Sequence, residues 1–373
     1  MIRIALVGLG KMGLSHQAII NSHPDAKLVS VCDSAGYLLD LINKYTGVKC
    51  YSDFEKMLNI EKLDAIFIAT PSRTHGAMVR MALEKNLHVF CEKPFCLDLT
   101  LGRELVSMAE TRRLVNQVGY HNRFIASFVE TKRLIEAGIL GDIHNVKIES
   151  YGPVVLKARS ATWRAKKSEG GGCLYDYASH GIDLLNYLIG RPDYVGGTAL
   201  NKIFSSDVED EVHSTLFYTN GLTAQLAANW SDESFRKMSN KASIWGRNGK
   251  IVVDRQELQV FLRTKPLGDG KLNAGWNVLY TTELTEDVWY YLRGEEYSAQ
   301  VDHFIESIKA DRFVTRSSFR SAFDADTISS MMLEDAMRDS AQPIHAKPTV
   351  TSSGGGWRGS VRDFYATFRQ SSG

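Results

Sequence analysis

The feature that most constrains the fold is a glycine fingerprint that directly follows a short apolar run. Residues 2–7 are apolar apart from Arg3, which is typical of a buried strand. The G-x-G-x-x-G spacing between a strand and a helix allows a tight turn and close approach of a pyrophosphate, which the helix N-terminus binds. The residues of this predicted phosphate-binding turn are Gly8, Gly10, Lys11, Met12 and Gly13.

Strands and helices alternate after this turn. Strand-like apolar runs occupy residues 27–32, 64–69, 87–91 and 114–119, and helical patterns occupy residues 12–22, 35–47, 72–85 and 100–113. Such alternation is typical of βαβ units around a parallel sheet, and the right-handed crossover rule leaves few other arrangements. We therefore predict a dinucleotide-binding α/β Rossmann domain over residues 1–120.

Asp33 follows the second predicted strand, where domains of this kind place an acid that hydrogen-bonds the adenosine ribose. An N-cap of the following helix is the alternative role, and one side chain can serve both. A carboxylate repels a 2′-phosphate, and no arginine or lysine occurs between Ser34 and Asn43. The sequence therefore predicts NAD rather than NADP.

The strand at residues 87–91 leads into Glu92, Lys93 and Pro94. A loop at the carboxyl end of a parallel strand is where open α/β sheets bind ligands. An isolated Lys-Pro pair is more often a solvated turn. The preceding strands and glycines favour a functional role for Lys93.

The pattern changes after residue 143. Strand-like runs occupy residues 143–151, 194–204, 211–218, 222–230, 242–245, 250–254 and 258–263, and helical patterns occupy residues 122–137, 297–310 and 318–338. Turn residues such as Asn220-Gly221 and Asn248-Gly249 join several strands as hairpins. We predict an α+β domain over residues 121–340, with a large, mainly antiparallel open sheet and helices on one face. The Ser- and Gly-rich residues 341–373 are predicted to be a C-terminal extension.

A second constellation follows the glycine run at residues 170–172. Asp176 and His180 are one helical turn apart on one predicted helix face, and Asp183 shares that face. A carboxylate beside an imidazole can orient it and tune its pKa for proton transfer. A surface pair or half a metal site are the alternatives. The cysteines show no metal-ligand spacing and no further His lies nearby, so we predict no metal.

Composition narrows the class of protein. A net charge of +1 over 373 residues does not favour a nucleic-acid or membrane-surface partner. No signal peptide or membrane-spanning apolar run is recognisable. The five cysteines are scattered, without metal or disulfide spacing, which favours a reduced cytoplasmic compartment.

Taken together, these motifs resemble those of the Gfo/Idh/MocA oxidoreductase family, which includes glucose–fructose oxidoreductase and myo-inositol dehydrogenase. The resemblance is carried by the glycine turn, Thr70-Pro71 with His75, Glu92-Lys93-Pro94, Arg123, Trp163, and the glycines leading to Asp176 and His180. It implies that Lys93, Asp176 and His180 are the catalytic set. It also implies cofactor contacts by Thr70, Pro71, His75 and Glu92, substrate contacts by Arg123 and Trp163, and homo-oligomers (dimers or tetramers) formed through the open sheet.

The sequence thus predicts an NAD-dependent oxidoreductase acting on a secondary alcohol of a sugar, sugar acid, nucleotide sugar or polyol. His180, helped by Asp176, would take the hydroxyl proton while Lys93 steadies the alkoxide. Lys93 is the alternative proton acceptor if burial lowers its pKa. Other functions to weigh are a sugar–sugar oxidoreductase with tightly bound cofactor and a non-catalytic cofactor- or sugar-sensing regulator. The presence of all three catalytic groups disfavours the regulator.

A basic run precedes the second constellation. Its members are Lys157, Arg159, Arg164, Lys166 and Lys167. A solvated loop is one interpretation, and a clamp for a carboxylate, phosphate or diphosphate is the other. We choose Arg164 as the contact, because a guanidinium binds such anions in a bidentate way. An acidic or nucleotide-linked sugar is therefore favoured over a neutral polyol.

Overall fold

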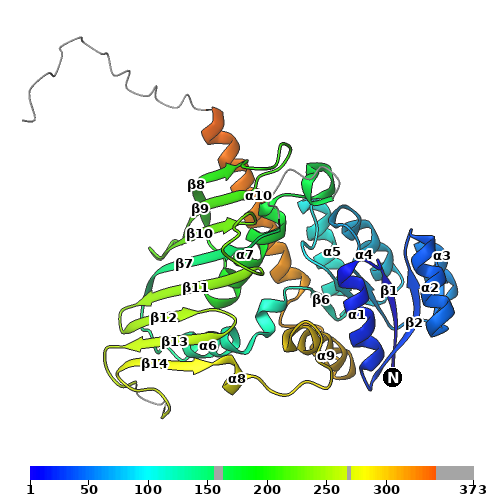
Figure 1. The fold of residues 1–373 in the computed structure, drawn as a ribbon, viewed down its shortest axis with the longest axis horizontal. Coiled ribbons are helices and arrows are strands. Elements are labelled where there is room, and N and C mark those ends of the chain that lie inside the picture. Colours follow the sequence, from blue (N-terminus) through cyan, green and yellow to red (C-terminus); the bar gives the residue numbers. More distant parts are fainter. Residues whose placement is uncertain (155–162, 267–269, 342–373) are drawn as a thin grey trace, which may run out of the picture.

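A computed structural model describes residues 1–154, 163–266 and 270–341 and contains two sheets (Figure 1). The first sheet has six strands and the second has eight. This is the predicted architecture, a Rossmann domain followed by an α+β domain. The predicted extension beyond residue 341 lies outside the described residues.

The first sheet is entirely parallel, with strand order β3-β2-β1-β4-β5-β6. The strands are β1 Ile2–Val7, β2 Ala26–Cys32, β3 Lys49–Tyr51, β4 Ala65–Ile68, β5 His88–Cys91 and β6 Asn116–Val118. The strand order reverses between β1 and β4. The crevice for a dinucleotide in such sheets lies at the carboxyl ends of these two strands.

Helices connect these strands. They are α1 Lys11–Ser22, α2 Gly36–Thr46, α3 Phe54–Ile60, α4 His75–Glu84 after the 3₁₀ turn η1 Ser72–Thr74, and α5 Leu99–Thr111. Asp98 caps α5, since its Oδ1 accepts hydrogen bonds from the N–H groups of Thr100 and Leu101. The sequence did not predict β3 and α3, because both are too short to show a clear period.

The core of the first domain includes a helix from the distant end of the chain. Phe67 of β4 and Phe90 of β5 stack with ring centroids 4.5 Å apart, and Phe304 packs edge-on against Phe67 at 5.4 Å. Phe304 belongs to α9, Glu295–Lys309, whose Val301 and Ile305 join the same buried cluster. The prediction that this helix lies on the second sheet was therefore wrong.

The second sheet has the order β14-β13-β12-β11-β7-β10-β9-β8. Its strands are β7 Ile143–Tyr151, β8 Tyr194–Asn201, β9 Glu211–Phe217, β10 Thr223–Asn229, β11 Ser239–Gly246, β12 Gly249–Val253, β13 Glu257–Leu262 and β14 Gly275–Tyr280. Only β7 and β10 pair in parallel. The antiparallel character and the tight turn between β11 and β12 are as predicted, and β14 was not foreseen.

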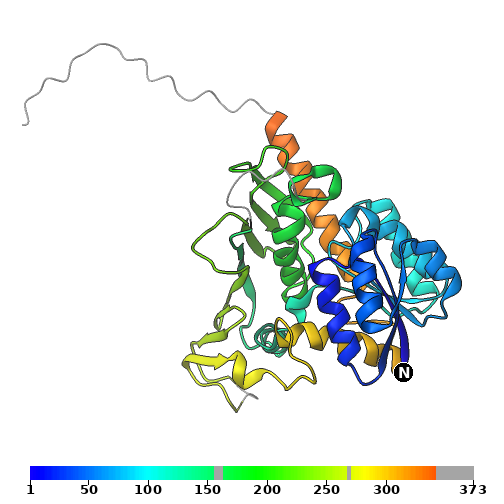
Figure 2. The same ribbon diagram turned by 45° about the vertical axis from the view of Figure 1, so that its right-hand side comes forward.

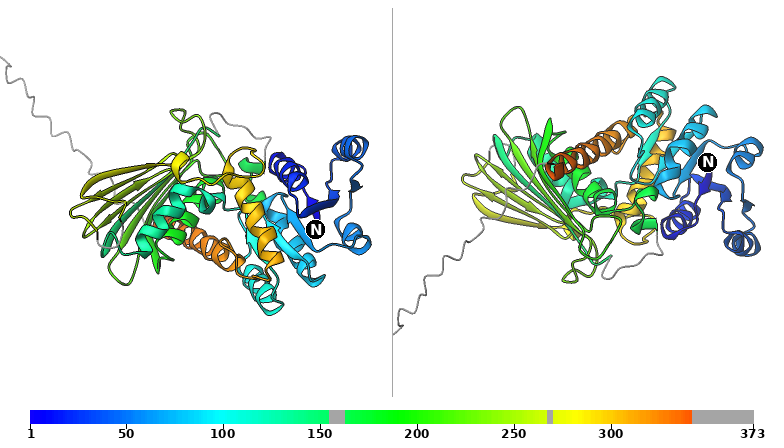
Figure 3. Two further views of the ribbon diagram at one scale, coloured as in Figure 1. Left: turned by 90° about the horizontal axis from the view of Figure 1, so that it is seen from below. Right: turned by 90° about the horizontal axis from the view of Figure 1, so that it is seen from above.

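Three helices, α6 Ala126–Glu136, α7 Ser179–Leu188 and α10 Phe319–Ala341, lie between this sheet and the first domain (Figure 2 and Figure 3). Shorter elements are the 3₁₀ turns η2 His121–Phe124, η3 Trp163–Ala165 and η4 Lys167–Glu169, the π-helix η5 Leu174–Ala178, and α8 Thr281–Leu284. On β14, Trp276, Val278 and Tyr280 are exposed. Within the described part of the chain, no helix covers this outer face (Figure 3).

Among the described residues, no helix has both the length and the apolar character that crossing a bilayer requires.

Candidate functional site

Lys93 and Asp176 join the two domains at the candidate site. Lys93 lies in the loop after β5, and Asp176 lies in η5 next to α7. The Lys93 Nζ donates to the Asp176 Oδ1 at 2.6 Å and to its backbone carbonyl at 2.8 Å. Their side chains are 12% and 8% exposed, so water screens this ion pair only weakly. The ion pair thus fixes the Lys93 side-chain nitrogen at the carboxyl end of the sheet.

Arg164 binds the other carboxylate oxygen. Its Nε donates to the Asp176 Oδ2 at 2.8 Å. Burial alone would raise the pKa of Asp176, but the charges of Lys93 and Arg164 outweigh it and lower that pKa to about 2. Asp176 is therefore an anion throughout the physiological pH range, and both of its oxygens are already bonded to cations, which disfavours it as a proton acceptor.

His180 is a buried residue of α7, and aromatic rings of neighbouring residues pack against its imidazole. Burial, followed by the nearby charges of Lys93 and His121, holds the pKa of His180 well below its usual range, so the imidazole is neutral. Within the described residues its Nδ1 has no hydrogen-bond partner. A neutral imidazole beside a fixed cation can accept a proton from a ligand hydroxyl.

The sequence predicts that the Asp176 carboxylate orients the His180 imidazole, and the hydrogen bonds among the described residues do not include one between them. Both carboxylate oxygens are bonded to cations, as described above, and in the described structure neither is bonded to His180. Lys93 and Arg164, which both lie outside this helix, occupy the two oxygens instead. Residues 174–178 themselves form a π-helix. Asp176 acts on Lys93 and not directly on the imidazole.

His121 is a neighbour of this cluster that the sequence did not reveal. Its ring centroid lies 5.0 Å from that of His180. The His121 ring also stacks on the ring of Tyr297 in α9, with centroids 4.8 Å apart. Burial lowers the pKa of His121 to about 3, although Glu92 opposes the change. Only tertiary structure brings Tyr297 here, whereas His121 follows the predicted strand at residues 114–119, the same kind of position as Lys93.

Asp183 and Arg123 form a separate buried ion pair. The Arg123 guanidinium donates to the Asp183 Oδ1 at 2.7 Å through Nη2, and its Nε lies within 3.1 Å of both carboxylate oxygens. Its Nη1 donates to the carbonyl of Arg316 at 2.8 Å. Burial raises the pKa of Asp183, and Arg123 opposes this rise. The structure does not support the predicted substrate contact by Arg123, because its side chain links η2 to α7.

The glycine turn has the geometry of a phosphate-binding turn. Gly8 has φ +88°, and a Cβ there would lie 2.5 Å from the Ala69 carbonyl oxygen; a Cβ on Gly13 would lie 1.8 Å from the Gly8 oxygen. Gly10, by contrast, faces open space. Lys11 and Met12 begin α1, whose first N–H groups are directed at the turn.

Asp33 lies beside this turn. Its Oδ2 accepts a hydrogen bond from the Leu9 N–H at 2.5 Å, and its Oδ1 accepts one from the Ala35 N–H at 2.7 Å. The side chain therefore fixes the turn against the start of α2, although Ala35 and not Asp33 is the N-cap residue. This placement leaves the half-buried carboxylate at the edge of the crevice, where a ribose would bind.

Thr70 and Pro71 follow β4 at the same edge of the sheet. The Thr70 hydroxyl accepts a hydrogen bond from the Thr74 hydroxyl at 2.7 Å. His75 is 1% exposed, and its ring nitrogens lie 2.7 Å from the Pro94 carbonyl and 2.9 Å from the Thr70 carbonyl. Direct cofactor contact by His75 is therefore not supported, since both nitrogens bind backbone.

The Glu92 side chain is held by residues of its own domain. Its Oε1 lies 2.7 Å from the Nε2 of His16, a fully buried residue of α1. Burial works to raise the pKa of Glu92, but the hydrogen bond and charge of His16 lower it overall. A Cβ on Gly119 would lie 2.7 Å from the Glu92 Oε2. The carboxylate is thus fixed between α1 and the chain after β6.

These features fit a dinucleotide. The open space at Gly10 and the N-terminus of α1 would accommodate a pyrophosphate, Asp33 lies where such folds place an acid for the ribose, and Lys93, Glu92 and Thr70 lie at the carboxyl ends of β4 and β5. The Trp163 side chain and Lys157 and Arg159 lie outside the described residues.

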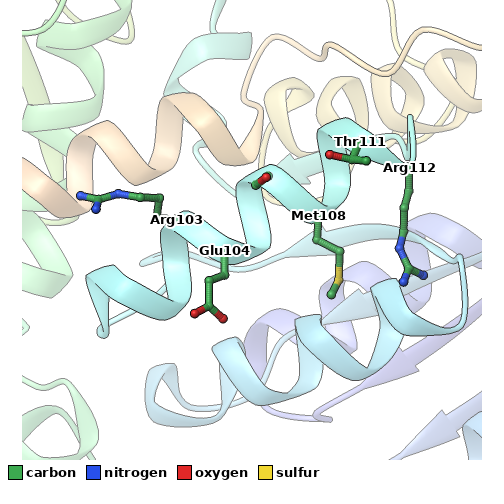
Figure 4. Close-up of a pocket in the computed structure, with 6 residues that line it drawn as sticks. Arg103, Glu104, Met108, Thr111 and Arg112 are labelled. Atoms are coloured by element: carbon green, nitrogen blue, oxygen red, sulfur yellow. The ribbon is translucent and has the colours of Figure 1, made fainter.

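A depression along α5 is separate from this site (Figure 4). It is lined by Arg103, Glu104, Ser107, Met108, Thr111 and Arg112. None of the predicted site residues is among them. The Arg112 side chain donates to the Leu83 carbonyl at 2.7 Å, which attaches it to the end of α4.

Both domains match models of known protein families. Residues 2–120 match a family model described as an oxidoreductase family with an NAD-binding Rossmann fold, and residues 128–252 match the GFO/IDH/MocA C-terminal domain. Inositol 2-dehydrogenase of Rhizobium meliloti is 24% identical over 83% of this chain and 89% of its own. scyllo-Inositol 2-dehydrogenase (NAD(+)) of Bacillus subtilis is 30% identical over 51% of this chain and 54% of its own.

A solved structure of levoglucosan dehydrogenase with NADH and levoglucosan has a TM-score of 0.80, 22% identity, and covers 91% of this chain and 97% of its own. The WlbA dehydrogenase of Bordetella pertussis, solved with NADH and UDP-GlcNAcA, has a TM-score of 0.75 and 22% identity, covering 91% and 96%. At this identity the two structures establish a shared fold.

Proposed function

Because the chain belongs to the Gfo/Idh/MocA family of NAD-binding oxidoreductases, we propose that it oxidises a secondary alcohol of a sugar, sugar acid, nucleotide sugar or polyol. The observation that carries this proposal is the contact of Lys93 with Asp176, next to the neutral, buried His180. Relatives named as inositol and D-glucoside dehydrogenases support the substrate class.

Each residue has a distinct role in this proposal. Lys93, fixed by Asp176, donates a hydrogen bond to the reacting hydroxyl and stabilises the negative charge that develops on it. His180 is the proton acceptor, because it is neutral, whereas Lys93 is ion-paired and Asp176 is bound by two cations. NAD, when bound, supplies the acceptor for the hydride.

The cofactor side is proposed to consist of the glycine turn, Asp33, Thr70, Pro71 and Glu92. The turn binds the pyrophosphate and Asp33 binds the ribose hydroxyls. We propose residues 1–120 as the dinucleotide-binding domain, with α9 completing its core, and residues 121–340 as the substrate-binding domain.

The outer face of the second sheet is proposed as a contact between identical subunits. Tyr194 and Phe217 stack on this face at one end of the sheet with centroids 4.9 Å apart, and Phe261 and Trp276 pair at the other end. Trp276 is 58% exposed. Large exposed aromatic side chains of this kind are typical of interface cores. Light scattering of the wild type and of Trp276→Lys would test whether a dimer or tetramer dissociates.

The function is tested by measuring NADH formation from NAD with panels of polyols, neutral sugars, sugar acids and nucleotide sugars. Turnover of at least one class is expected. Tight NADH binding without turnover of any member would contradict the dehydrogenase and favour a cofactor-sensing regulator. Oxidation of one sugar coupled to reduction of another, without cofactor exchange, would favour the sugar–sugar oxidoreductase.

A further inference from the structure

A buried acid of α10 holds the loop that carries Lys93. Asp326 is 5% exposed, and its Oδ2 accepts a hydrogen bond from the Cys96 N–H at 2.9 Å. The Phe95 N–H is directed at the same carboxyl group. Backbone N–H groups of the loop that follows Pro94 thus find their acceptor on a helix of the other domain.

Apolar contacts strengthen this attachment. The Phe95 ring lies on Phe319 of α10 with centroids 4.3 Å apart, and both rings are fully buried. On the other side of the loop, the His75 ring reaches the Pro94 carbonyl at 2.7 Å. The backbone on the C-terminal side of Lys93 is therefore fixed by α4 from one domain and by α10 from the other.

We propose that Asp326 is a positioning residue for Lys93: it fixes the backbone of residues 94–96 so that the Lys93 ammonium reaches Asp176. Asp326 itself does not touch the reacting groups. Its action on turnover rests on the proposed function, whereas its action on the loop does not. Errors of about 1 Å in the placement of a catalytic group can cost on the order of 10²-fold in rate.

The protonation state of Asp326 is compatible with this role. Burial raises the pKa of Asp326 to about 8, Asp183 adds to the rise, and the N–H groups of Cys96 and Phe95 oppose it. Both the acid and the carboxylate keep an oxygen that can accept from Cys96. The attachment is therefore present on both sides of neutral pH.

The first test needs no substrate. Asp326→Ala removes the acceptor, Asp326→Asn keeps an acceptor oxygen, and Asp324→Asn is the control, because Asp324 lies on the same helix but pairs with Arg191 at 3.3 Å. We expect Asp326→Ala to raise amide hydrogen exchange at residues 95–96 and acylation of Lys93 by an amine reagent, each about tenfold. Asp326→Asn should stay close to the wild type and Asp324→Asn should match it. Unchanged exchange and acylation in Asp326→Ala would overturn the proposal.

The second test is kinetic. In Asp326→Ala, kcat should fall about tenfold or more, while the Kd for NADH stays within about twofold. In a Lys93→Ala background the same substitution should lower kcat little further, because there is no Lys93 ammonium left to position. Equal losses in both backgrounds would show a merely structural role. If the wild type oxidises no sugar, the proposed function fails, and the exchange and acylation results still decide the role of Asp326.

Discussion

The ammonium nitrogen of Lys93 lies 2.6 Å from the Asp176 Oδ1, and this contact joins a loop of the first sheet to a helix beneath the second. Neither domain holds the site alone. Because Asp176 is also bound by Arg164, it remains an anion and forms an ion pair with Lys93. Among the three predicted catalytic residues, His180 is then the group suited to accept a proton.

Lys93→Ala and His180→Ala should each lower kcat by about 10²–10⁴-fold, the usual effect of losing a positioned acid–base or electrostatic group. NADH affinity should change little, because the glycine turn and Asp33 are proposed to make most of the cofactor contacts. Steady-state kinetics with fluorescence titration measure both quantities. Lys166→Ala is the control for loss of a lysine at an exposed position. Wild-type kcat in either variant would exclude that residue from catalysis.

Cofactor choice should depend on Asp33. The wild type should bind NADH more tightly than NADPH, because the carboxylate accepts hydrogen bonds from a free ribose and repels a 2′-phosphate. Asp33→Ser should reduce this preference, measured as the ratio of the two Kd values. It should also weaken NADH binding somewhat, since the Leu9 N–H loses its acceptor. Tighter binding of NADPH by the wild type would refute the role of Asp33.

Arg123 should contribute to stability and not to substrate binding. Arg123→Ala leaves Asp183 buried without its partner, and breaking a buried pair typically costs about 3–5 kcal/mol. Arg320→Ala is the matched control, because its pair with Glu110 is exposed and worth about 1 kcal/mol or less. Denaturant unfolding compares the two. A stability loss in Arg123→Ala no larger than in Arg320→Ala would argue that its guanidinium serves another purpose.

Sequence patterns predicted most of the fold, because every strand except β3 and β14 shows a recognisable apolar or alternating run and the glycine turn fixes the topology of the first sheet. They did not predict the position of α9, whose Phe304 packs on Phe67 across a large separation in the chain. The amphipathic pattern of a helix shows that it has an apolar face but not which sheet that face covers.

The site residues, like the fold, were predicted from the sequence only in part. The sequence identified Lys93, Asp176 and His180, but it placed the Asp176 carboxylate beside His180, because helix periodicity does not reveal that Lys93 and Arg164 bind both of its oxygens. It assigned ligand contacts to Arg123 and His75, which are held by Asp183 and by backbone carbonyls. Tyr297 and Asp326 are brought to the site region only by packing between distant elements.

The buried acid of α10 should make stability depend on pH. The pKa of Asp326 is about 8 in the folded protein and near its ordinary value of 3.8 in the unfolded chain. Between these values the folded state binds more protons, so this residue lowers the free energy of unfolding as pH rises, by at most about 1.4 kcal/mol per pH unit. Asp326→Asn should gain stability relative to the wild type from pH 4 to 8. A difference that does not vary with pH would show that Asp326 is ionised across this range.

The last prediction concerns the charge of the substrate. Arg164 is half-exposed and its Nε binds Asp176, which places the guanidinium next to Lys93 at the edge of the site. A substrate carboxylate or phosphate near Lys93 would meet this second cation. Arg164→Ala should raise KM for an acidic or nucleotide-linked sugar about tenfold or more, the effect expected from losing a charged hydrogen bond.

A neutral analogue separates this effect from the role of Arg164 toward Asp176. Loss of the Asp176 contact should lower kcat by a similar factor for charged and neutral substrates, and this factor should be smaller than the change in KM. The increase in KM should be confined to the charged substrate. Lys166→Ala removes a charge from the same basic run without a contact to Asp176 and should leave both constants nearly unchanged. Equal efficiency of the wild type on a free sugar and on its charged counterpart would refute the anion clamp, because a cation that binds the substrate must discriminate between them.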